Sequence, residues 1–541
     1  MLFLLDYGAG NVTSLANSIR KLGHQFRWIE TSADFEAATS LVFPGVGAFE
    51  SAIQHLSHRG LLEPLRKYIL SGRPYFGICI GMQVLYQSSE ESRSPGLGII
   101  PGPIERFSDN DKAVPHIGWN SSQPLDVLLP QDVCTHFYFV HSYCAKYKPE
   151  KFPEAAQWAH TTTQYGEEIF VSSVRKGDVF GTQFHPEKSG GAGLALLDAW
   201  LRGTLPAHEP EGPRVSRPLN LKHGLTKRII ACMDVRANDE GDLVVTKGDQ
   251  YDVRERVALA ATAGGAVRNL GKPIALAERY YDAGADELCL LNITSFRHSP
   301  LQDQPMLAVV RVAAERLFIP LTIGGGIKDT IDPDGTPRAA LEVASAYFRA
   351  GADKVSIGSE AVYAVERLRA RGGVADGTSA IETIAHAYGR QAVVVSIDPR
   401  RTFVDPGEDL GSRVSEVVRT TDGTAWWYQC TVSGGRETRP LSVVELAQGV
   451  EMLGAGEILL NSIDRDGTGL GFDLDLLALV KRSVRIPVVA SSGAGSASHF
   501  VEAFAQTDVE AALAAGIFHR DEVKISEVKE ALRSAGINAR Q

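Results

Sequence analysis

Residues 227–235 read KRIIACMDV and residues 391–399 read QAVVVSIDP, and this matching pair of segments decides the fold. Each is a short apolar run that ends beside an aspartate, a pattern typical of a buried strand. Three further segments follow each of them in the same order, and they match in pairs: GADELCLLNIT with GAGEILLNSID, IPLTIGGGI with IPVVASSGAG, and GADKVSIGSEAV with DVEAALAAGIFH. The sequence therefore predicts an internal two-fold repeat of four strand-and-turn units.

Eight such strands, alternating with helical patterns across residues 227–541, predict a (β/α)8 barrel. The alternative is an open doubly wound sheet, which the ordered repeat disfavours. We expect insertions relative to a minimal barrel near residues 236–273, 328–346 and 371–380, because these stretches are polar and rich in Gly, Asp and Arg.

Residues 1–203 predict a separate α/β domain. Short apolar strands such as LFLLDYG and SLVFPGVG alternate there with amphipathic helical patterns, the order typical of a largely parallel sheet covered by helices. Between this domain and the barrel, residues 204–226 contain four prolines and no apolar periodicity. This composition predicts a semi-extended linker.

Composition limits the classes of function. The chain has 541 residues and a net charge of −10, and this balance disfavours a nucleic-acid partner, which requires a basic surface. The six cysteines include no C-x-x-C pair, as is typical of a protein in a reducing cytosol. We read no signal peptide and no membrane span, so we expect a cytoplasmic protein. No metal cluster or dinucleotide fingerprint stands out, and we expect no cofactor.

A nucleophile elbow is predicted at Gly77-Ile78-Cys79-Ile80-Gly81, between an apolar strand and a helical segment. Taken alone, Cys79 could equally be a small buried side chain. However, FHPEK at residues 184–188 supplies His185 as a candidate general base and Glu187 as the group that orients its ring. The two motifs together indicate a cysteine hydrolase site. The turn Pro44-Gly45-Val46-Gly47 is either an oxyanion site or a plain strand-to-helix turn.

Two aspartates occupy equivalent strand ends in the predicted repeat, Asp234 in ACMDV and Asp398 in VSIDP. Because a barrel carries its chemistry at the C-terminal strand ends, this pair can serve as general acid and general base. The alternative is that both aspartates cap the next helix or loop.

Glycine-rich turns follow the third and seventh predicted strands, and small-residue turns follow the fourth and eighth. Backbone N–H groups in such turns hold phosphate. Two sites related by the repeat predict a substrate with a phosphate at each end, bound near Gly325, Gly326, Gly358, Ser359, Ser492, Gly493, Ala515 and Gly516.

Four charged residues stand at equivalent strand starts, so we expect them to form a ring at the N-terminal face of the barrel: Arg228, Glu287, Lys354 and Glu457. One interpretation is an ion-paired plug that stabilises the barrel. The other is a gate over a passage along the barrel axis.

Residues 1–203, with GICIG, HPEK and PGVG, resemble the class I glutamine amidotransferase domain. The resemblance implies that Cys79 is the nucleophile, His185 the general base and acid, and Glu187 the residue that orients His185. It further implies oxyanion donors near Gly47 and a glutamine-binding role for Gln83. Many members have Gly-Gly at the turn where this chain has Gly45-Val46, which suggests an oxyanion site that is misoriented at rest.

Nearly all of residues 227–541 resembles the cyclase subunit of the imidazole glycerol phosphate synthase family, through strings such as KRIIACMDV, QAVVVSIDPRR and GAGEILLNSIDRDGT. The resemblance implies a bisphosphorylated ribotide substrate, an acid–base pair of Asp234 and Asp398, and ammonia passage through the charged ring. It also implies that Lys247 lies on a mobile loop, that Asp466 lies near the reacting end of the substrate, and that Lys188 and Asp353 form a salt bridge between docked domains. Asn292 stands where some members have aspartate.

Two other functions compete with this interpretation. A different glutaminase-coupled barrel synthase, which builds a pyridoxal phosphate-type ring, would need a Schiff-base lysine where this chain has Asp234 or Asp398. A metabolite-sensing scaffold with an inactive glutaminase would not need Cys79, His185 and Glu187 together. Glutamate release with and without the barrel ligand separates the scaffold from the enzyme.

Overall fold

The computed structural model describes residues 1–8, 10–45, 47–125, 135–205, 213–220, 224–237, 243–246, 273–292, 305–332, 334–405 and 411–541. The chain forms two compact units. Unit 1 comprises Met1–Thr226 and His386–Gln391, and unit 2 comprises Lys227–Ala385 and Ala392–Gln541. No helix in the described ranges is long and apolar enough to cross a membrane.

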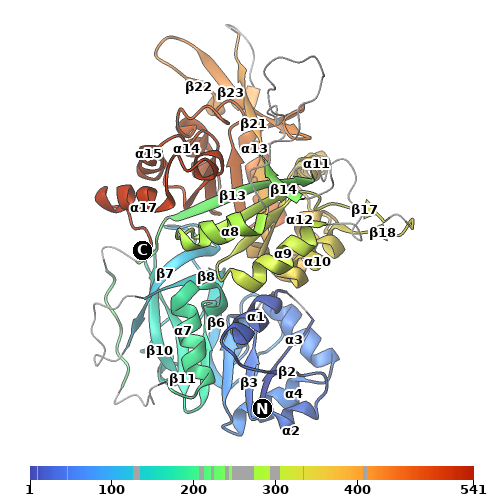
Figure 1. The fold of residues 1–541 in the computed structure, drawn as a ribbon, viewed down its shortest axis with the longest axis vertical. Coiled ribbons are helices and arrows are strands. Elements are labelled where there is room, and N and C mark those ends of the chain that lie inside the picture. The colour runs from blue at the N-terminus through green and yellow to red at the C-terminus, as the bar shows by residue number, and fades with distance from the viewer. Residues whose placement is uncertain are drawn as a thin grey trace. The chain divides into compact units, whose positions relative to one another are not determined.

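Unit 1 is built on a mixed sheet, whose elements run from blue to green in Figure 1. The described strands follow the order β2 (Arg27–Trp28), β1 (Leu2–Leu4), β3 (Ser40–Phe43), β4 (Tyr75–Ile78), β12 (Val179–Thr182), β11 (Glu168–Lys176), β10 (Ala159–Tyr165), β7 (His116–Pro124) and β8 (Thr135–His141). The first five are parallel and the remainder antiparallel. The parallel half places the ends of β4 and β12 side by side, since Ile78 pairs with Thr182.

The parallel strands are nearly continuous apolar runs because helices cover them. Helix α1 (Thr13–Lys21) and helix α7 (Gly190–Leu201) contribute Leu15, Ile19 and Leu197 to a core shared with Phe76 on β4 and Phe180 on β12. The remaining described helices of this half are α2 (Asp34–Ala37), α3 (Phe49–His58), α4 (Leu62–Leu70), α5 (Ile80–Gln83) and α6 (Pro153–Ala156). A smaller sheet joins β5 (Tyr86–Ser89), β6 (Ile100–Arg106) and β9 (Tyr143–Cys144).

Unit 2 contains a closed barrel of parallel strands, as predicted. Around the ring the strands are β13 (Arg228–Ala237), β15 (Glu287–Asn292), β16 (Leu321–Gly324), β19 (Lys354–Ile357), β20 (Val393–Ile397), β25 (Glu457–Asn461), β26 (Val488–Ser491) and β27 (Ala511–Ala514). Pairing of β27 with β13 closes the ring. The matched sequence segments fall on strands four places apart in this order, such as β13 and β20. The two-fold repeat itself stays a prediction from the sequence.

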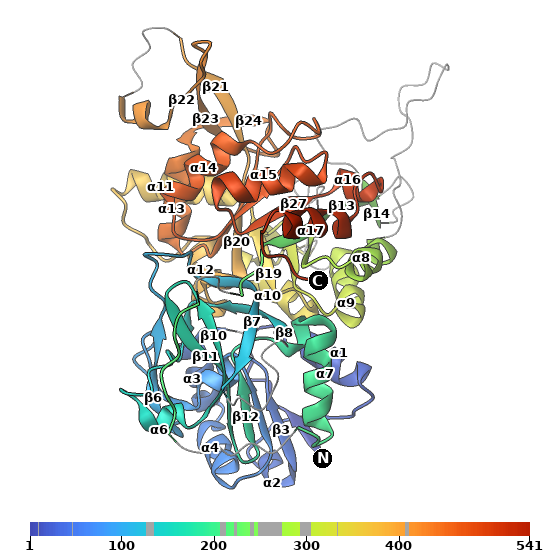
Figure 2. The same cartoon turned by 90° about the vertical axis from the view of Figure 1, so that its left-hand side faces the viewer.

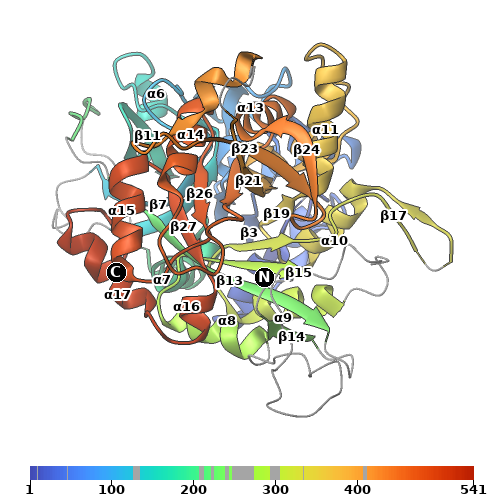
Figure 3. The same ribbon diagram turned by 90° about the horizontal axis from the view of Figure 1, so that it is seen from above.

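Helices lie outside the barrel strands, as Figure 3 shows from above, and α14 and α15 lie next to each other in Figure 2. The described helices are α8 (Pro273–Asp282), α9 (Pro305–Arg316), α10 (Ala340–Ala350), α11 (Ser359–Ala370), α12 (Ala380–Tyr388), α13 (Val443–Leu453), α14 (Leu474–Ser483), α15 (Ala497–Thr507), α16 (Gly516–His519) and α17 (Ile525–Ser534). Local sequence sets their ends. At α13, Ser442 Oγ accepts from Glu445 N and Glu445 Oε2 accepts from Ser442 N, and Gly454 ends the helix at a φ of 107°.

One insertion was not predicted from the sequence. After β20 the chain forms a separate antiparallel sheet of β21 (Pro399–Phe403), β22 (Val418–Arg419), β23 (Ala425–Val432) and β24 (Glu437–Ser442). Of the predicted insertions, 328–346 contains the hairpin of β17 (Thr330–Ile331) and β18 (Pro337–Arg338), and 371–380 connects α11 to α12. Most of 236–273 lies outside the described residues, apart from β14 (Leu243–Thr246), which pairs with β13.

Candidate functional site

Cys79 sits on a sharp turn between β4 and α5, with φ 49° and ψ −102°. An L-residue adopts positive φ only at an energetic cost, and such strain is typical of a nucleophile elbow. The surrounding glycines are required by close packing. A Cβ on Gly77 would lie 2.2 Å from the Gly81 carbonyl oxygen, and one on Gly45 would lie 1.7 Å from the Ile78 oxygen. Because α5 is a single turn, its dipole contributes little to the stability of a thiolate.

The imidazole of His185 lies within hydrogen-bond distance of Glu187, the residue predicted to orient it. Its Nδ1 lies 2.8 Å from Glu187 Oε1, and both side chains are buried. Burial alone would lower the pKa of His185, but the charge of Glu187 and a hydrogen bond with Cys79 raise it to about 10. The imidazole therefore holds a proton at neutral pH, in contact with the sulfur. Ser189 fixes the turn, since its Oγ donates to the His185 carbonyl at 2.6 Å.

Gln83, the predicted glutamine-binding residue, lies behind the nucleophile. Its Nε2 donates to the Tyr143 carbonyl at 2.9 Å and to Gln183 Oε1 at 3.0 Å. Its Oε1 is buried and has no hydrogen-bond partner among the described residues. Gln183 in turn donates from Nε2 to Cys79 Sγ at 3.4 Å. Sequence reasoning missed Gln183, although a buried polar residue between the end of β12 and His185 was a signal.

The predicted oxyanion turn is described only in part. Gly47 is buried with a φ of 135°, in the region that favours glycine, but Val46 lies outside the described residues. The predicted direction of its N–H groups therefore stays a prediction. Just after the turn, Phe49 N donates to Glu91 Oε2 at 2.9 Å, and burial raises the pKa of Glu91 to about 7. Glu91 was also missed, because no local motif marks it.

A cavity of about 380 Å³ opens at the C-terminal ends of strands β13, β26 and β27. Asp234 and Asp466 line it together with both predicted turns of that half, Ser492-Gly493 and Ala515-Gly516. The glycines are tightly placed: a Cβ on Gly493 would lie 2.3 Å from the Gly471 oxygen. His519, which was not predicted, also lines the cavity, and its buried Nε2 has no hydrogen-bond partner in the described part of the chain.

Asp398, the second predicted aspartate, is half-buried and directly follows β20. Asn461 Nδ2 donates to its Oδ1 at 2.7 Å, and Thr431 Oγ1 donates to its backbone carbonyl at 2.6 Å. Burial raises the pKa of Asp398, and the charge of Asp466 adds to this, while the bonds from Asn461 and Ser396 oppose it. Asp398 therefore retains a proton more readily than an ordinary aspartate.

The other residues predicted at the C-terminal face of the barrel include some that the structure describes and one that it does not. Gly325 and Gly326 follow β16 with φ of 92° and 77°, and Gly358 precedes α11, where Ser359 Oγ accepts from Ser433 N at 2.9 Å. Asn292 is the last residue of β15. Lys247 lies outside the described residues.

The four predicted ring charges meet inside the barrel and are all buried. Arg228 pairs with Glu287 at 2.8 Å and with Glu457, and Lys354 Nζ lies 2.6 Å from both carboxylates. Burial raises the pKa of Glu457, but Arg228 and Lys354 outweigh it, so the net pKa is lowered. Each cation thus bridges two anions, and the four side chains form one closed ring.

Replacement of Lys354 by methionine should leave Glu287 and Glu457 to share one guanidinium inside the barrel. Breaking a buried ion pair costs about 3–5 kcal/mol. We therefore expect the midpoint of urea-induced unfolding of the barrel to shift to a markedly lower urea concentration. Arg316→Met is the control, because its pair with Glu278 is exposed and such pairs contribute about 0–1 kcal/mol. Equal urea midpoints for the two variants would show that the ring does not stabilise the barrel.

The pairing predicted between Lys188 and Asp353 joins the two units and stays a prediction. Within its own unit, Lys188 is buried in the turn of Pro186–Lys188. Asp353 Oδ2 accepts a hydrogen bond from Leu321 N at 2.8 Å.

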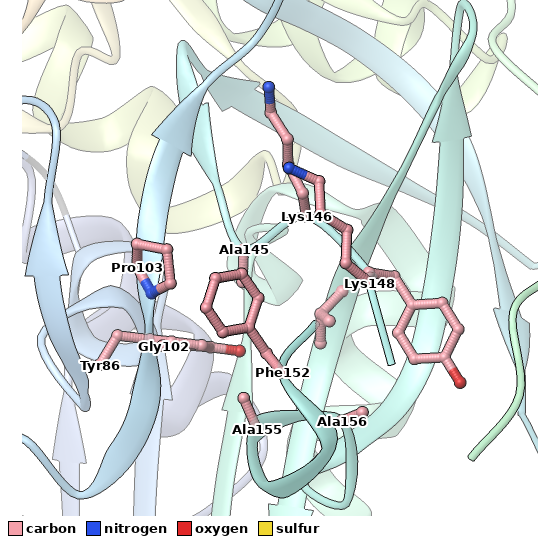
Figure 4. A pocket seen from close by; sticks show the side chains of 11 residues that line it. Tyr86, Gly102, Pro103, Ala145, Lys146, Lys148, Phe152, Ala155 and Ala156 are labelled. Atoms are coloured by element: carbon pink, nitrogen blue, oxygen red, sulfur yellow. The ribbon is translucent and has the colours of Figure 1, made fainter. Parts of the chain in front are cut away.

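A second hollow lies in unit 1 and contains no residue of the cysteine site. Its volume is about 20 Å³, and Tyr86, Lys146, Lys148 and Phe152 are among the residues around it (Figure 4). The Tyr86 hydroxyl is buried without a hydrogen-bond partner among the described residues. The space suits a single water molecule rather than a substrate.

Comparison with known proteins gives two family matches, one for each part of the chain. Residues 228–524 match the family described as histidine biosynthesis protein, and residues 3–201 match the class-I glutamine amidotransferases. The imidazole glycerol phosphate synthase hisHF of Emericella nidulans is 52% identical over 99% of this chain and 98% of its own length. That of Schizosaccharomyces pombe is 52% identical over 98% of both chains. A chloroplastic one from Arabidopsis thaliana is 52% identical over 99% of this chain and 89% of its own.

Proposed function

The chain belongs to the family of fused imidazole glycerol phosphate synthases, and on this premise we propose how its residues divide the work. It is a bifunctional enzyme of histidine biosynthesis, with a glutamine amidotransferase and a cyclase on one chain. We assign glutamine hydrolysis to residues 1–203 and cyclisation to residues 227–541, with residues 204–226 as the linker.

In the glutaminase, the Cys79 thiolate attacks the carboxamide carbon of glutamine. The C–N bond breaks as His185 gives its proton to the leaving nitrogen, and ammonia departs from the thioester. His185 then takes a proton from water, which attacks the thioester and releases glutamate. Glu187 holds the ring in place throughout, which its 2.8 Å contact with Nδ1 supports. Gln83 binds the substrate through its Oε1, which is buried and has no hydrogen-bond partner among the described residues.

In the cyclase, the substrate is a ribotide with a phosphate at each end, and its products are imidazole glycerol phosphate and aminoimidazole carboxamide ribotide. One phosphate binds at Ser492-Gly493 and Ala515-Gly516, and the other at the turns after β16 and β19. The observation that carries this proposal is the cavity of about 380 Å³, which is lined by Asp234 and Asp466 and by the turns Ser492-Gly493 and Ala515-Gly516. Asp398, with its raised pKa, is the general acid, and Asp234 is the base.

Ammonia reaches the cyclase site along the barrel axis. Apolar and thiol side chains fill the interior next to the ring, among them Ile230, Cys232, Val394, Leu459 and Val489. A neutral, small molecule can cross such a lining, whereas an ammonium ion cannot. The ring of Arg228, Glu287, Lys354 and Glu457 is closed by ion pairs, so passage requires at least one pair to open.

The composition of the chain also bears on its location and partners. We infer a cytosolic location and no nucleic-acid partner, since the chain has a net charge of −10. The Arabidopsis relative is named as chloroplastic, so the location can differ between relatives.

The test is an assay of the purified full chain. With glutamine and the bisphosphorylated ribotide, we expect glutamate and imidazole glycerol phosphate in equal amounts. With glutamine alone, we expect a much slower release of glutamate. Release of glutamate without any cyclised product would remove the cyclase assignment, and absence of glutamate would remove the glutaminase assignment.

A further inference from the structure

A chain of hydrogen bonds leads away from the nucleophile into the antiparallel half of unit 1. Gln183 donates to Cys79 Sγ, and its Oε1 accepts from Gln83 Nε2. The second hydrogen of that nitrogen goes to the Tyr143 carbonyl. Because a carbonyl can only accept, both amide hydrogens of Gln83 are committed, and the amide of Gln183 can point only one way.

The chain continues through two histidines that face each other across β7 and β8, where His116 pairs with His141. His141 Nδ1 lies 2.8 Å from the Tyr143 carbonyl oxygen, and its Nε2 lies 3.3 Å from His116 Nδ1. Asn120 Nδ2 lies 3.2 Å from His116 Nε2. Asn120 must present this nitrogen as a donor, since the same group donates to the Gln164 carbonyl.

The hydrogen-bond partners determine which ring nitrogen of each histidine carries a hydrogen. His141 Nδ1 must carry hydrogen, because its partner is the Tyr143 carbonyl. In a neutral ring Nε2 is then an acceptor, so His116 donates to it from Nδ1 and accepts from Asn120 at Nε2. Donation therefore runs from Asn120 through His116 and His141 to the Tyr143 carbonyl. On the other side of that carbonyl, Gln83 donates both to it and to Gln183, and Gln183 donates to the sulfur.

Aromatic rings surround both histidines. His116 stacks on Tyr165 and Phe139, with ring centroids 4.1 and 5.1 Å away, and His141 lies 5.3 Å from Phe107. Both histidines are buried. Burial, together with the charge of the nearby His185, lowers the pKa of His141 to about 3 against the opposing effect of the bond to the Tyr143 carbonyl, so this ring is uncharged at neutral pH.

We propose that His141 is a positioning residue of the glutaminase, acting through the Tyr143 carbonyl on Gln83 and Gln183. Its N–H holds that carbonyl where it orients the Gln83 amide, which in turn presents Gln183 Nε2 to the sulfur. An N–H donor aimed at sulfur favours the thiolate. The same arrangement leaves Gln83 Oε1, which is buried and has no hydrogen-bond partner among the described residues, as an acceptor for an N–H of glutamine. The inference rests on the proposed glutaminase site and adds residues outside it.

Two nearly isosteric variants separate the roles of the two ring nitrogens. In His141→Asn the amide nitrogen replaces Nδ1 and keeps the donor to Tyr143, whereas in His141→Gln the amide lies at the position of Nε2. Loss of one buried hydrogen bond corresponds to about a tenfold change. We expect kcat/KM for glutamine to fall about tenfold in the Gln variant and less than about threefold in the Asn variant. Ammonia-dependent cyclisation should be unchanged in both.

The rate at which iodoacetamide alkylates Cys79 reports on the sulfur directly. It should fall in His141→Gln in parallel with kcat/KM, and stay near wild type in His141→Asn. Equal impairment of the two variants, or equal wild-type behaviour, would overturn the proposal. If the His141 variants fail to fold, Gln183→Met cuts the chain at its last link, and a wild-type alkylation rate there would equally overturn it. A wild-type chain that releases no glutamate would instead contradict the proposed function, while the alkylation rates would still test the positioning role.

Discussion

Replacement of Cys79 by alanine should abolish glutamine-dependent cyclisation and leave ammonia-dependent cyclisation unchanged. In the proposed mechanism Cys79 forms the covalent intermediate, so its loss should reduce glutamine turnover by at least about a thousandfold. Ammonia supplied in solution reaches the barrel without the thioester, and the cyclase rate should therefore stay within about twofold of wild type at saturating ammonia. The measurement is the formation of imidazole glycerol phosphate from the same ribotide with each nitrogen source.

Cys144→Ala is the matched control for this variant. Cys144 is another buried thiol of unit 1, but burial raises its pKa well above the usual value, so it is not a thiolate. We expect its replacement to leave both activities within a few-fold of wild type. If the Cys79 variant lost both activities while the Cys144 variant kept them, the two reactions would not occur at separate sites.

The cysteine site could be predicted from the sequence because its parts are local. Five consecutive residues form the elbow around Cys79, and His185 and Glu187 are two positions apart. Gln183 and Glu91 could not be found in the same way. Their positions depend on contacts between residues far apart in the sequence. The pairing of β12 with β4 brings Gln183 close to the sulfur of Cys79, and Glu91 accepts a hydrogen bond from the backbone N–H of Phe49.

The barrel was predictable for a different reason, since each strand carries the same apolar run and the same kind of turn. That pattern placed Asp234, Asp398 and the four ring charges at strand ends without any contact information. It could not show that Asn461 donates to Asp398, or how Arg228 and Lys354 share two carboxylates. The sheet inserted after β20 was missed because its sequence, rich in Arg, Trp and Thr, does not match the segment after β13 in the other half of the predicted repeat.

Replacement of Asp234 or Asp398 by asparagine should produce the opposite defect. General acid–base groups contribute about a hundredfold to ten-thousandfold, so we expect ammonia-dependent cyclisation to fall by at least about a hundredfold in either variant. Glutamine hydrolysis should persist, since neither residue belongs to the cysteine site. Asp475→Asn, an exposed position on α14, is the control and should cyclise at the wild-type rate. A wild-type rate in Asp234→Asn would show that the acid–base assignment is wrong.

The pH profile of ammonia-dependent cyclisation distinguishes the acid from the base. Burial raises the pKa of Asp398, and a general acid acts in its protonated form, so kcat/KM should fall as pH rises through that raised value. Asn461→Leu removes the donor that stabilises the charged form of Asp398 at 2.7 Å. This limb of the profile should therefore move to higher pH in the Asn461 variant, because the neutral carboxyl becomes still more favoured. A limb that stays in place, or one that moves to lower pH, would mean that Asp398 is not the acid.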